Sequence, residues 1–313
     1  MVRLVADIGA TNARFGLVLA DGTALHSSTF SGAEFPTIAD AIRAYLARIG
    51  SHPVPRVGCL AIAGPANSDE IRMTNRPWNF SVAALRDELG FERLEVINDF
   101  TAVALALPHL TPADRMTVGG GMPVVGRPIA VLGPGSGLGV SGLIPAGAVW
   151  LPLHGEGGHV TMAPATDRES AVLDLMRRRI SQVSAERCLS GPGLVNLYTS
   201  LATLDGVSVE PYSAAQITDQ AIANQDRLCQ EATAIFCAML GTIAGDLALT
   251  LGAQGGVYIA GGIVPRLGAR FAESGFRTRF EAKGRLSPYL AAIPTYVVTH
   301  PLPAFLGCAV SLT

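Results

Sequence analysis

Val5-Ala6-Asp7-Ile8-Gly9-Ala10-Thr11-Asn12-Ala13-Arg14-Phe15 is the most informative stretch of this 313-residue chain. A short run of β-forming residues, 2–8, leads into a polar turn that contains a glycine, and a second apolar run, 14–19, follows the turn. Apolar residues then recur at helical intervals over 37–49, and residues 56–63 have the composition of a buried strand. Strands that alternate with helices predict a layered α/β architecture.

A change of composition near residue 110 predicts a domain boundary. Residues 109–127 are rich in proline, glycine and threonine, whereas the residues before them continue the alternation of helices and strands. The chain ends with an apolar helical segment, 305–310, which we expect to return to the first domain. The predicted domains are a small α/β domain, 1–109 plus 299–313, and a large α/β domain, 110–298.

The pattern of the first domain returns after this boundary. The strand 129–132 leads into Gly133-Pro134-Gly135-Ser136-Gly137-Leu138-Gly139-Val140, again a glycine-rich turn between two apolar runs. Two such units at corresponding places suggest an ancient duplication. Residues 137–142 also satisfy GxGxxG, but Pro145 and Gly147 follow where a dinucleotide-binding fold requires a helix, so we reject that interpretation.

Composition excludes several classes of protein. The formal net charge is −2, with 23 basic and 25 acidic residues, so nucleic acid and anionic membranes are not expected partners. Lys283 is the only lysine, and its surroundings match neither a Walker A loop nor a protein-kinase strand. A Schiff-base mechanism would need the same lysine, which lies among charged residues rather than in an apolar pocket.

The cysteines and the longest apolar run indicate a cytoplasmic protein. The five cysteines are widely spaced and form no CxxC pair, which favours a reducing compartment without disulfides or a zinc ribbon. The N-terminus has no signal-peptide pattern. The apolar run 232–245 is shorter than the roughly 20 residues of a membrane span, so we interpret it as a buried helix.

Several polar groups next to turns could carry chemistry. Either glycine-rich turn could present backbone N–H groups to phosphate, or could merely close a hairpin. Asn98-Asp99 follows a predicted strand, 94–97, and precedes an apolar helix, 102–107, where a carboxylate could accept a substrate proton or cap the helix.

Glycines surround two further groups of polar residues. His154-Gly155-Glu156-Gly157-Gly158-His159 lacks the spacing of a helical metal site and suits hydrogen bonding to a polyol better. Glu186 precedes Ser190-Gly191-Pro192-Gly193, and taken alone it is most simply a solvated surface charge.

Taken together, these motifs resemble those of the bacterial glucokinases in the hexokinase and actin-like ATPase superfamily, over essentially the whole chain. The resemblance implies a two-domain actin-like ATPase (ribonuclease H-like) α/β fold with an interdomain cleft. The matching segments are a first phosphate motif (Val5 to Phe15), a catalytic segment (Ile97 to Phe100), a second phosphate motif (Leu132 to Val140), sugar-binding segments (Glu156 to His159 and Glu186 to Gly193) and an adenosine motif (Ile259 to Ile263).

The resemblance also implies a role for each matching residue in the transfer of the γ-phosphate of ATP to the 6-hydroxyl of D-glucose. Asp99 would be the general base, and Asp7 would act on Mg²⁺ through water. The other implied groups are sugar ligands (Asn98, Asp99, Glu156, His159 and Glu186) and nucleotide contacts (Asp7, Gly9, Ala10, Thr11, Asn12, Ser136, Gly137, Gly261 and Gly262). The implied partners are D-glucose and MgATP, and the implied assembly is a homodimer.

Alternatives remain open at this point. A kinase for mannose or fructose, or one that uses polyphosphate, would carry the same motifs. A sugar-sensing regulatory protein would not need Asp99, and an actin-like filament or chaperone ATPase would not need Glu156, His159 and Glu186. The chain lacks the cysteine cluster and N-terminal helix-turn-helix of the related repressors, so a DNA-binding repressor is not expected. Ala10 and Ser136 stand where many relatives have glycine and threonine.

Overall fold

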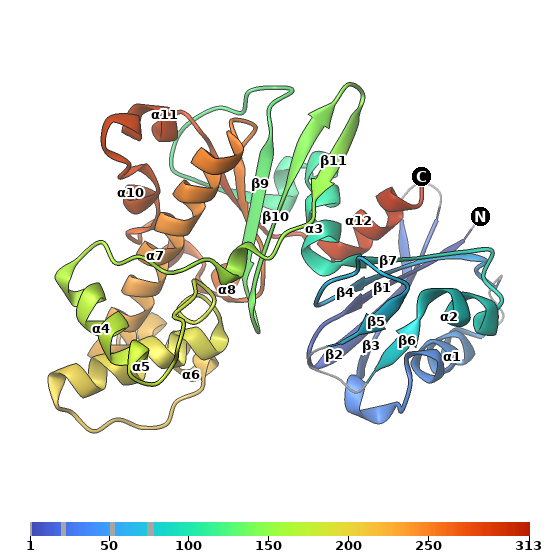
Figure 1. Ribbon diagram of the computed structural model, residues 1–313, viewed down its shortest axis with the longest axis horizontal. Coiled ribbons are helices and arrows are strands. Elements are labelled where there is room, and N and C mark those ends of the chain that lie inside the picture. Colours follow the sequence, from blue (N-terminus) through green and yellow to red (C-terminus); the bar gives the residue numbers. More distant parts are fainter. Residues whose placement is uncertain (1, 20–22, 51–53, 74–77) are drawn as a thin grey trace. The chain divides into compact units, whose positions relative to one another are not determined.

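The computed structural model describes residues 2–19, 23–50, 54–73 and 78–313. The chain divides into two compact units (Figure 1). The small unit comprises Met1–Thr111 and His300–Thr313, and the large unit comprises Pro112–Thr299.

The small unit is built on a five-stranded sheet with the order β3-β2-β1-β4-β7. β1 pairs antiparallel with β2 and parallel with β4, which in turn pairs parallel with β7. The strands are β1 (Arg3–Ile8), β2 (Asn12–Val18), β3 (Ala24–Ser31), β4 (Val57–Ile62) and β7 (Arg93–Asn98), with a separate two-stranded sheet of β5 (Glu70–Arg72) and β6 (Asn79–Ser81).

Helices cover both faces of this sheet (Figure 1). Side chains of successive strand residues point to opposite faces, so Leu4, Ala6 and Ile8 join the core under the first two helices, while the alternate residues face the last two. Glycine follows directly on α1 and α2, at Gly50 and Gly90, with positive φ. The helices are α1 (Ile38–Ile49) and α2 (Val82–Leu89) on one face, and α3 (Asp99–Ala106) and α12 (Pro303–Ser311) on the other.

The large unit contains a six-stranded sheet with the order β11-β10-β9-β12-β13-β8. β9 pairs antiparallel with β10 and parallel with β12, and β12 pairs parallel with β13. The strands are β8 (Arg115–Val118), β9 (Ile129–Pro134), β10 (Leu138–Ala146), β11 (Val149–Leu153), β12 (Val257–Ile259) and β13 (Thr295–Val298).

The two sheets therefore share one topology. Three consecutive antiparallel strands (β1-β2-β3 and β9-β10-β11) are extended on the side of the first strand by two parallel ones, β4-β7 in the small unit and β12-β13 in the large unit. Only β8, paired with β13, has no counterpart in the described small sheet. This repetition agrees with the duplication that the two glycine turns suggest.

The helices of the large unit pack around α7, which is 25 residues long. Its N-cap is Asp226 and its C-cap is Gly252. By length and composition α7 could cross a membrane, but it lies in the main core cluster with Phe236 and Leu240 fully buried, as expected for a central helix of a globular unit. The helices are α4 (Asp167–Arg177), α5 (Gly191–Asp205), α6 (Ala214–Ile222), α7 (Arg227–Leu251), α8 (Ile263–Leu267), α9 (Ala269–Ala272), α10 (Phe276–Glu281) and α11 (Ser287–Ala291).

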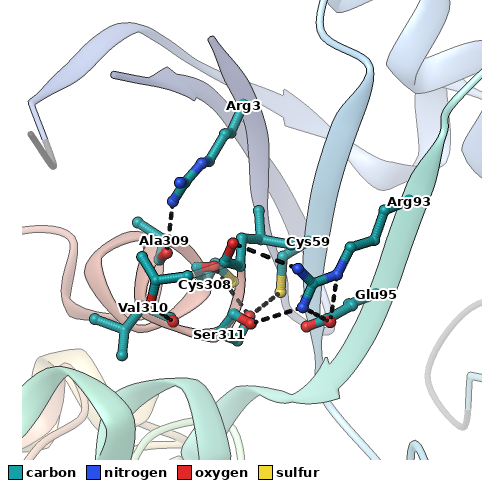
Figure 2. Close-up of polar contacts among 10 residues, drawn as sticks. Arg3, Cys59, Arg93, Glu95, Cys308, Ala309, Val310 and Ser311 are labelled. Atoms are coloured by element: carbon teal, nitrogen blue, oxygen red, sulfur yellow. Dashed lines mark hydrogen bonds and ion pairs between the residues drawn. The ribbon is translucent and has the colours of Figure 1, made fainter. Parts of the chain in front are cut away.

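The C-terminal helix α12 is tied to the small sheet by polar contacts at its last turn (Figure 2). Arg3 donates to the carbonyl of Ala309 at 3.2 Å, and Arg93 donates to the carbonyls of Ser311 and Leu312 at 3.2 and 3.5 Å. Cationic donors at a helix C-terminus satisfy carbonyls that the helix leaves without partners. The Ser311 hydroxyl also reaches the sulfur of Cys59 at 3.3 Å.

Close packing of α12 on α3 depends on Gly307. A Cβ atom at this position would lie 1.7 Å from the carbonyl oxygen of Ala102, so any side chain would force the two helix backbones apart. Because α3 begins at Asp99, the contact between α3 and α12 also helps to fix the position of the predicted catalytic residue.

Most predicted elements are confirmed, with shifts at their ends. The apolar run 232–245, interpreted as a buried helix, lies within α7. The helix expected over 102–107 begins three residues earlier, at Asp99. The expectations for this segment missed the capping role of Asn98, described below.

Candidate active site

Within the small unit, the predicted catalytic and metal-binding carboxylates lie at one edge of the sheet. Ile8, Ile62 and Asn98 are register partners on the parallel strands β1, β4 and β7. Parallel strands end at the same edge, and neighbouring strands are about 4.8 Å apart, so the turn after β1 and the start of α3 are separated by about 10 Å. This is the strand edge at which α/β proteins place ligand groups.

The first glycine turn joins β1 to β2 and is closed by backbone hydrogen bonds. Gly9 N–H donates to the carbonyl of Asn12 at 3.0 Å, and Gly32 N–H donates to the carbonyl of Thr11 at 3.1 Å. Thr11 and Asn12 are exposed. The turn thus presents two polar residues to solvent at the sheet edge.

Asp7 and Arg14 face each other across β1 and β2, and their side chains form an ion pair at 3.6 Å. The Asp7 side chain is 29% exposed and that of Arg14 45% exposed. Burial raises the pKa of Asp7 above its ordinary value, and the Arg14 charge opposes this rise. The site therefore holds an incompletely compensated carboxylate, which a cation would stabilise.

The residues at the start of α3 have distinct roles. Asn98 is the N-cap: its amide oxygen accepts from the N–H groups of Phe100 and Thr101 at 2.9 and 3.0 Å, and its amide nitrogen donates to Gly64 at 3.2 Å. Asp99 occupies the first turn, where one carboxylate oxygen accepts from Phe100 N–H at 2.8 Å. Capping, one of the two interpretations of Asn98-Asp99, is thus supplied by Asn98.

In the large unit, the second glycine turn joins β9 to β10 and is held from outside the hairpin. Gly135 N–H donates to Gly137 within the turn at 2.8 Å. Gly191 N–H, at the first position of α5, donates to the Gly135 carbonyl at 2.8 Å, and the Leu138 N–H donates to Oε2 of Glu186 at 2.9 Å.

The two sugar-binding segments predicted in this unit pack against the same turn. Gly158 lies so close that a Cβ atom there would be 2.1 Å from the Leu138 carbonyl oxygen. Glu186 N–H donates to the Gly158 carbonyl at 2.9 Å, which joins the two segments to each other. Glu156 and His159, at the start and end of this short 3-10 turn, are exposed.

The predicted adenosine turn follows β12 and lies beside the second phosphate turn. Gly261 has φ +81°, and a Cβ atom there would be 2.3 Å from the Pro134 carbonyl oxygen. Because β12 and β9 are parallel neighbours, both turns leave the sheet at one edge. Gly262 follows and precedes α8.

The predicted site residues thus form one group in each unit. In the small unit the group is Asp7, Gly9, Ala10, Thr11, Asn12, Asn98 and Asp99, and in the large unit it is Ser136, Gly137, Glu156, His159, Glu186, Gly261 and Gly262. Arg14 was not among the predicted site residues, although strand alternation across a short turn pairs it with Asp7. Leu138 was not among them either, because its backbone contact with Glu186 has no signal in the sequence.

Asp7 is suited to one kind of metal site. Among the described residues, no group of three or more His, Cys, Asp or Glu could hold a metal ion. Mg²⁺ does not need such a cage, since it is commonly held by one or two carboxylates, several waters and the phosphates of its nucleotide. A single partly buried carboxylate beside the predicted phosphate-binding turn fits that requirement.

Comparisons with known proteins agree with this geometry. The glucokinase family profile matches residues 4–313. The chain is 54% identical to the glucokinase of Paramagnetospirillum magneticum, over 98% of this chain and 96% of that protein.

Two solved structures show the same fold. The glucokinase from an Antarctic psychrotroph is 38% identical and superposes with a TM-score of 0.88, over 99% of this chain and 98% of that one. A ROK-family glucokinase from Streptomyces griseus, solved with glucose and AMPPNP, is 19% identical and superposes with a TM-score of 0.69, over 99% and 98%. With its α/β layers, two-unit organisation and whole-length match, the chain belongs to the glucokinase family, the ATP-dependent kinases of glucose.

Proposed function

We propose that this protein transfers the γ-phosphate of ATP to the 6-hydroxyl of D-glucose and that Asp99 is the general base. The observation that carries the proposal is the place of Asp99: it lies in the first turn of α3, directly after the N-cap Asn98, at the sheet edge that also carries the turn after β1. A carboxylate there can accept the hydroxyl proton as the oxygen attacks phosphorus.

The sugar is held, in this proposal, by Asn98, Glu156, His159 and Glu186. Exposure of Glu156 and His159 leaves their polar atoms available to hydroxyl groups. The amide oxygen of Asn98 already accepts two backbone N–H groups at the helix cap, and its amide nitrogen already donates to Gly64. Asn98 would therefore bind the sugar through amide atoms that also make these hydrogen bonds. Carboxylates accept from hydroxyls and imidazole can donate or accept, which suits a polyol.

ATP is held by the two glycine turns and the adenosine turn. The contacts would come from Gly9, Ala10, Thr11 and Asn12 in the first turn, from Ser136 and Gly137 in the second, and from Gly261 and Gly262 at the adenosine. Bound Mg²⁺ supplies charge neutralisation on the transferring phosphate, and Asp7 would hold it through water. The raised pKa of Asp7 supports this assignment, because a nearby cation would offset the cost of its burial.

Productive transfer also requires the reacting groups to meet. We propose that the small and large units close over the sugar and exclude water that would compete for the γ-phosphate. Scattering measurements should show compaction on addition of glucose; unchanged dimensions would contradict closure.

The test of the proposed function is ATP-dependent phosphorylation of glucose, mannose, fructose and N-acetylglucosamine by the wild type and by Asp99→Asn. Glucose-selective turnover that is lost in Asp99→Asn supports both the substrate and the role of Asp99. Turnover of another hexose at equal efficiency would favour a broader hexose kinase. Tight glucose binding without turnover would favour a sugar sensor, and sugar-independent ATP hydrolysis would favour an actin-like ATPase.

We also propose a homodimer, joined through the β10–β11 hairpin. Ile144, Val149 and Leu151 lie on one face of this hairpin and are 41%, 59% and 53% exposed. No charged residue occurs from Leu138 to Leu153, so two copies of the face can meet about a two-fold axis without like-charge repulsion. Leu151→Glu would place like charges together and should give a monomer in light scattering, whereas a monomeric wild type would refute the dimer.

The location that we propose is the cytoplasm. All five cysteines are free and buried, which is the form that a reducing compartment maintains.

A further inference from the structure

Glu186 has two connections that its predicted role as a sugar ligand does not explain. Its Oε2 atom accepts the Leu138 N–H at 2.9 Å, and it lies 2.5 Å from where a Cβ atom of residue 137 would be. The carboxylate thus rests directly on the backbone of the second phosphate turn. No other described side chain is recorded as a hydrogen-bond partner of that turn's backbone between Gly135 and Leu138.

The backbone of Glu186 is itself fixed on both sides. Its N–H donates to the Gly158 carbonyl at 2.9 Å, and its carbonyl accepts from the hydroxyl of Ser190, the N-cap of α5, at 2.8 Å. A carboxylate on so constrained a backbone can hold a turn in one conformation. Its other oxygen, Oε1, has no recorded hydrogen bond among the described residues, and a carboxylate can accept several hydrogen bonds at once.

We infer that Glu186 is a positioning residue for the nucleotide: it holds the second phosphate turn in its binding conformation through Leu138, independently of the sugar. This inference rests on the proposed function, because it needs the turn to bind ATP phosphates. It also implies that a sugar hydroxyl on Oε1 and the Leu138 amide on Oε2 are held by the same carboxylate. Binding of the sugar should therefore strengthen binding of the nucleotide, and binding of the nucleotide should strengthen binding of the sugar.

If Glu186 acted only through its charge, loss of its side chain would change the nucleotide affinity in one direction; if it acts by positioning the turn, the affinity should change in the other. A negative charge next to a phosphate site repels the nucleotide, so its removal alone should tighten nucleotide binding. Loss of the hydrogen bond should instead weaken binding, since hydrogen bonds to charged groups are among the stronger ones and the freed turn must be ordered again by the ligand. Glu186→Gln removes the charge and keeps an acceptor, whereas Glu186→Ala removes both.

The experiment measures the affinity of Mg-AMPPNP without glucose for the wild type, Glu186→Gln and Glu186→Ala. Glu186→Ala should bind about tenfold more weakly, and Glu186→Gln should stay within about threefold of the wild type. Both variants should raise the KM for glucose. Glu156→Ala is the matched control: it should raise the glucose KM and leave the affinity for Mg-AMPPNP unchanged.

Gly137→Ala provides a second route that leaves Glu186 itself unsubstituted. The backbone of Gly137 is outside the positive-φ region, and the recorded obstacles to its Cβ atom are Oε2 and Cδ of Glu186. Alanine should therefore displace the carboxylate and weaken Mg-AMPPNP binding as Glu186→Ala does. In the double variant the obstacle is gone, so Gly137→Ala should add nothing to the loss caused by Glu186→Ala.

The outcomes separate this inference from the proposed function. If Glu186→Ala, Glu186→Gln and the wild type bind Mg-AMPPNP equally, or if the single losses of Glu186→Ala and Gly137→Ala add fully, the inference is wrong. Glucose phosphorylation by the wild type then still supports the proposed function. If the wild type neither binds Mg-AMPPNP nor phosphorylates glucose, the proposed function itself fails. Should Glu186→Ala not fold, the comparison of Gly137→Ala with Glu186→Gln still decides.

Discussion

The hairpin turns of the two sheets occupy the same place in one topology, yet they differ in charge. The difference lies in the second residue pair from each turn. In the small unit this pair is Asp7 on β1 and Arg14 on β2, whereas in the large unit it is Gly133 on β9 and Gly139 on β10. The first turn therefore has its own carboxylate. The second receives one from Glu186, 48 residues further along the chain.

This difference shows how one scaffold can serve two functions. The small unit carries the carboxylates assigned to the metal and to the base, together with Asn98, and the large unit carries the other groups assigned to recognition of the sugar and those assigned to the adenosine. The comparison predicts that substitutions in the small unit act mainly on kcat or on folding, whereas Glu156 and His159 in the large unit act mainly on the KM for glucose.

Asp99→Asn should have the largest effect on catalysis. General-base catalysis contributes roughly 10²- to 10⁴-fold, so kcat should fall by about that factor while the KM for glucose changes little. Asparagine keeps the shape of the side chain and removes the base, and unchanged circular dichroism would exclude misfolding. A fall in glucose affinity at normal kcat would place Asp99 among the recognition groups instead and would break the comparison.

Gly307→Ala should destabilise the small unit by about 3 kcal/mol, at the upper end of the range for overpacked cores, because the obstacle is the Ala102 backbone. Activity should fall with it, since the displaced α3 begins at Asp99. Gly191→Ala in the large unit is the control, because its Cβ atom would make only ordinary contacts, of 3.5 Å or more. Urea unfolding of both variants measures the difference; equal midpoints would contradict this account of the α3–α12 contact.

Asp7→Asn should lower kcat/KM for MgATP by about 10- to 100-fold, the range seen when groups that support a bound metal are removed. It should also raise the melting temperature at pH 7. Burial raises the pKa of Asp7, so the folded protein binds this proton more tightly than the unfolded chain does, and the ionised carboxylate costs stability at neutral pH.

The stabilising effect of Asp7→Asn should shrink as the pH falls through the raised pKa of Asp7 and should vanish well below 3.8, the ordinary pKa of an aspartate, where the wild-type carboxyl is protonated in both states. Thermal melts from pH 8 downwards measure it. A wild type that is more stable than Asp7→Asn at pH 7 would show that Arg14 more than compensates for the burial.

Arg93→Ala should have the smallest effect, about 0.5–1 kcal/mol of stability with unchanged kcat. The side chain is half exposed, so its hydrogen bonds to the carbonyls of Ser311 and Leu312 compete with water. Denaturant titration measures the loss. An effect as large as that of Gly307→Ala would mean that the last turn of α12, rather than its contact with α3, secures the helix.

Much of the fold was predictable from local pattern. The strand–turn–strand segments around Gly9 and Gly135 and the buried helix at 232–245 were predicted, because apolar runs and turn glycines are local signals. The short strand β13 and helix α6 were not predicted. β13 has four residues, all buried, and so has no alternation from which to recognise it.

The candidate site was predictable residue by residue only through the resemblance to a family. Glu186 taken alone resembles a surface charge, and its contact with Leu138 joins residues from separate elements through a backbone atom, which leaves no trace in side-chain composition. The choice between Asn98 and Asp99 as the cap was also beyond the sequence, because both residue types cap helices well.

The place of α12 has a consequence for biosynthesis. This helix packs on strands formed some 300 residues earlier, with Arg3 bonded to Ala309, while the large unit is one uninterrupted segment of chain. During synthesis the large unit can therefore complete its core while the small sheet still lacks the cover of α12 over Cys59. We expect the nascent small unit to stay sensitive to proteases and thiol reagents until α12 has been synthesised and can pack on the sheet, with the large unit already protected.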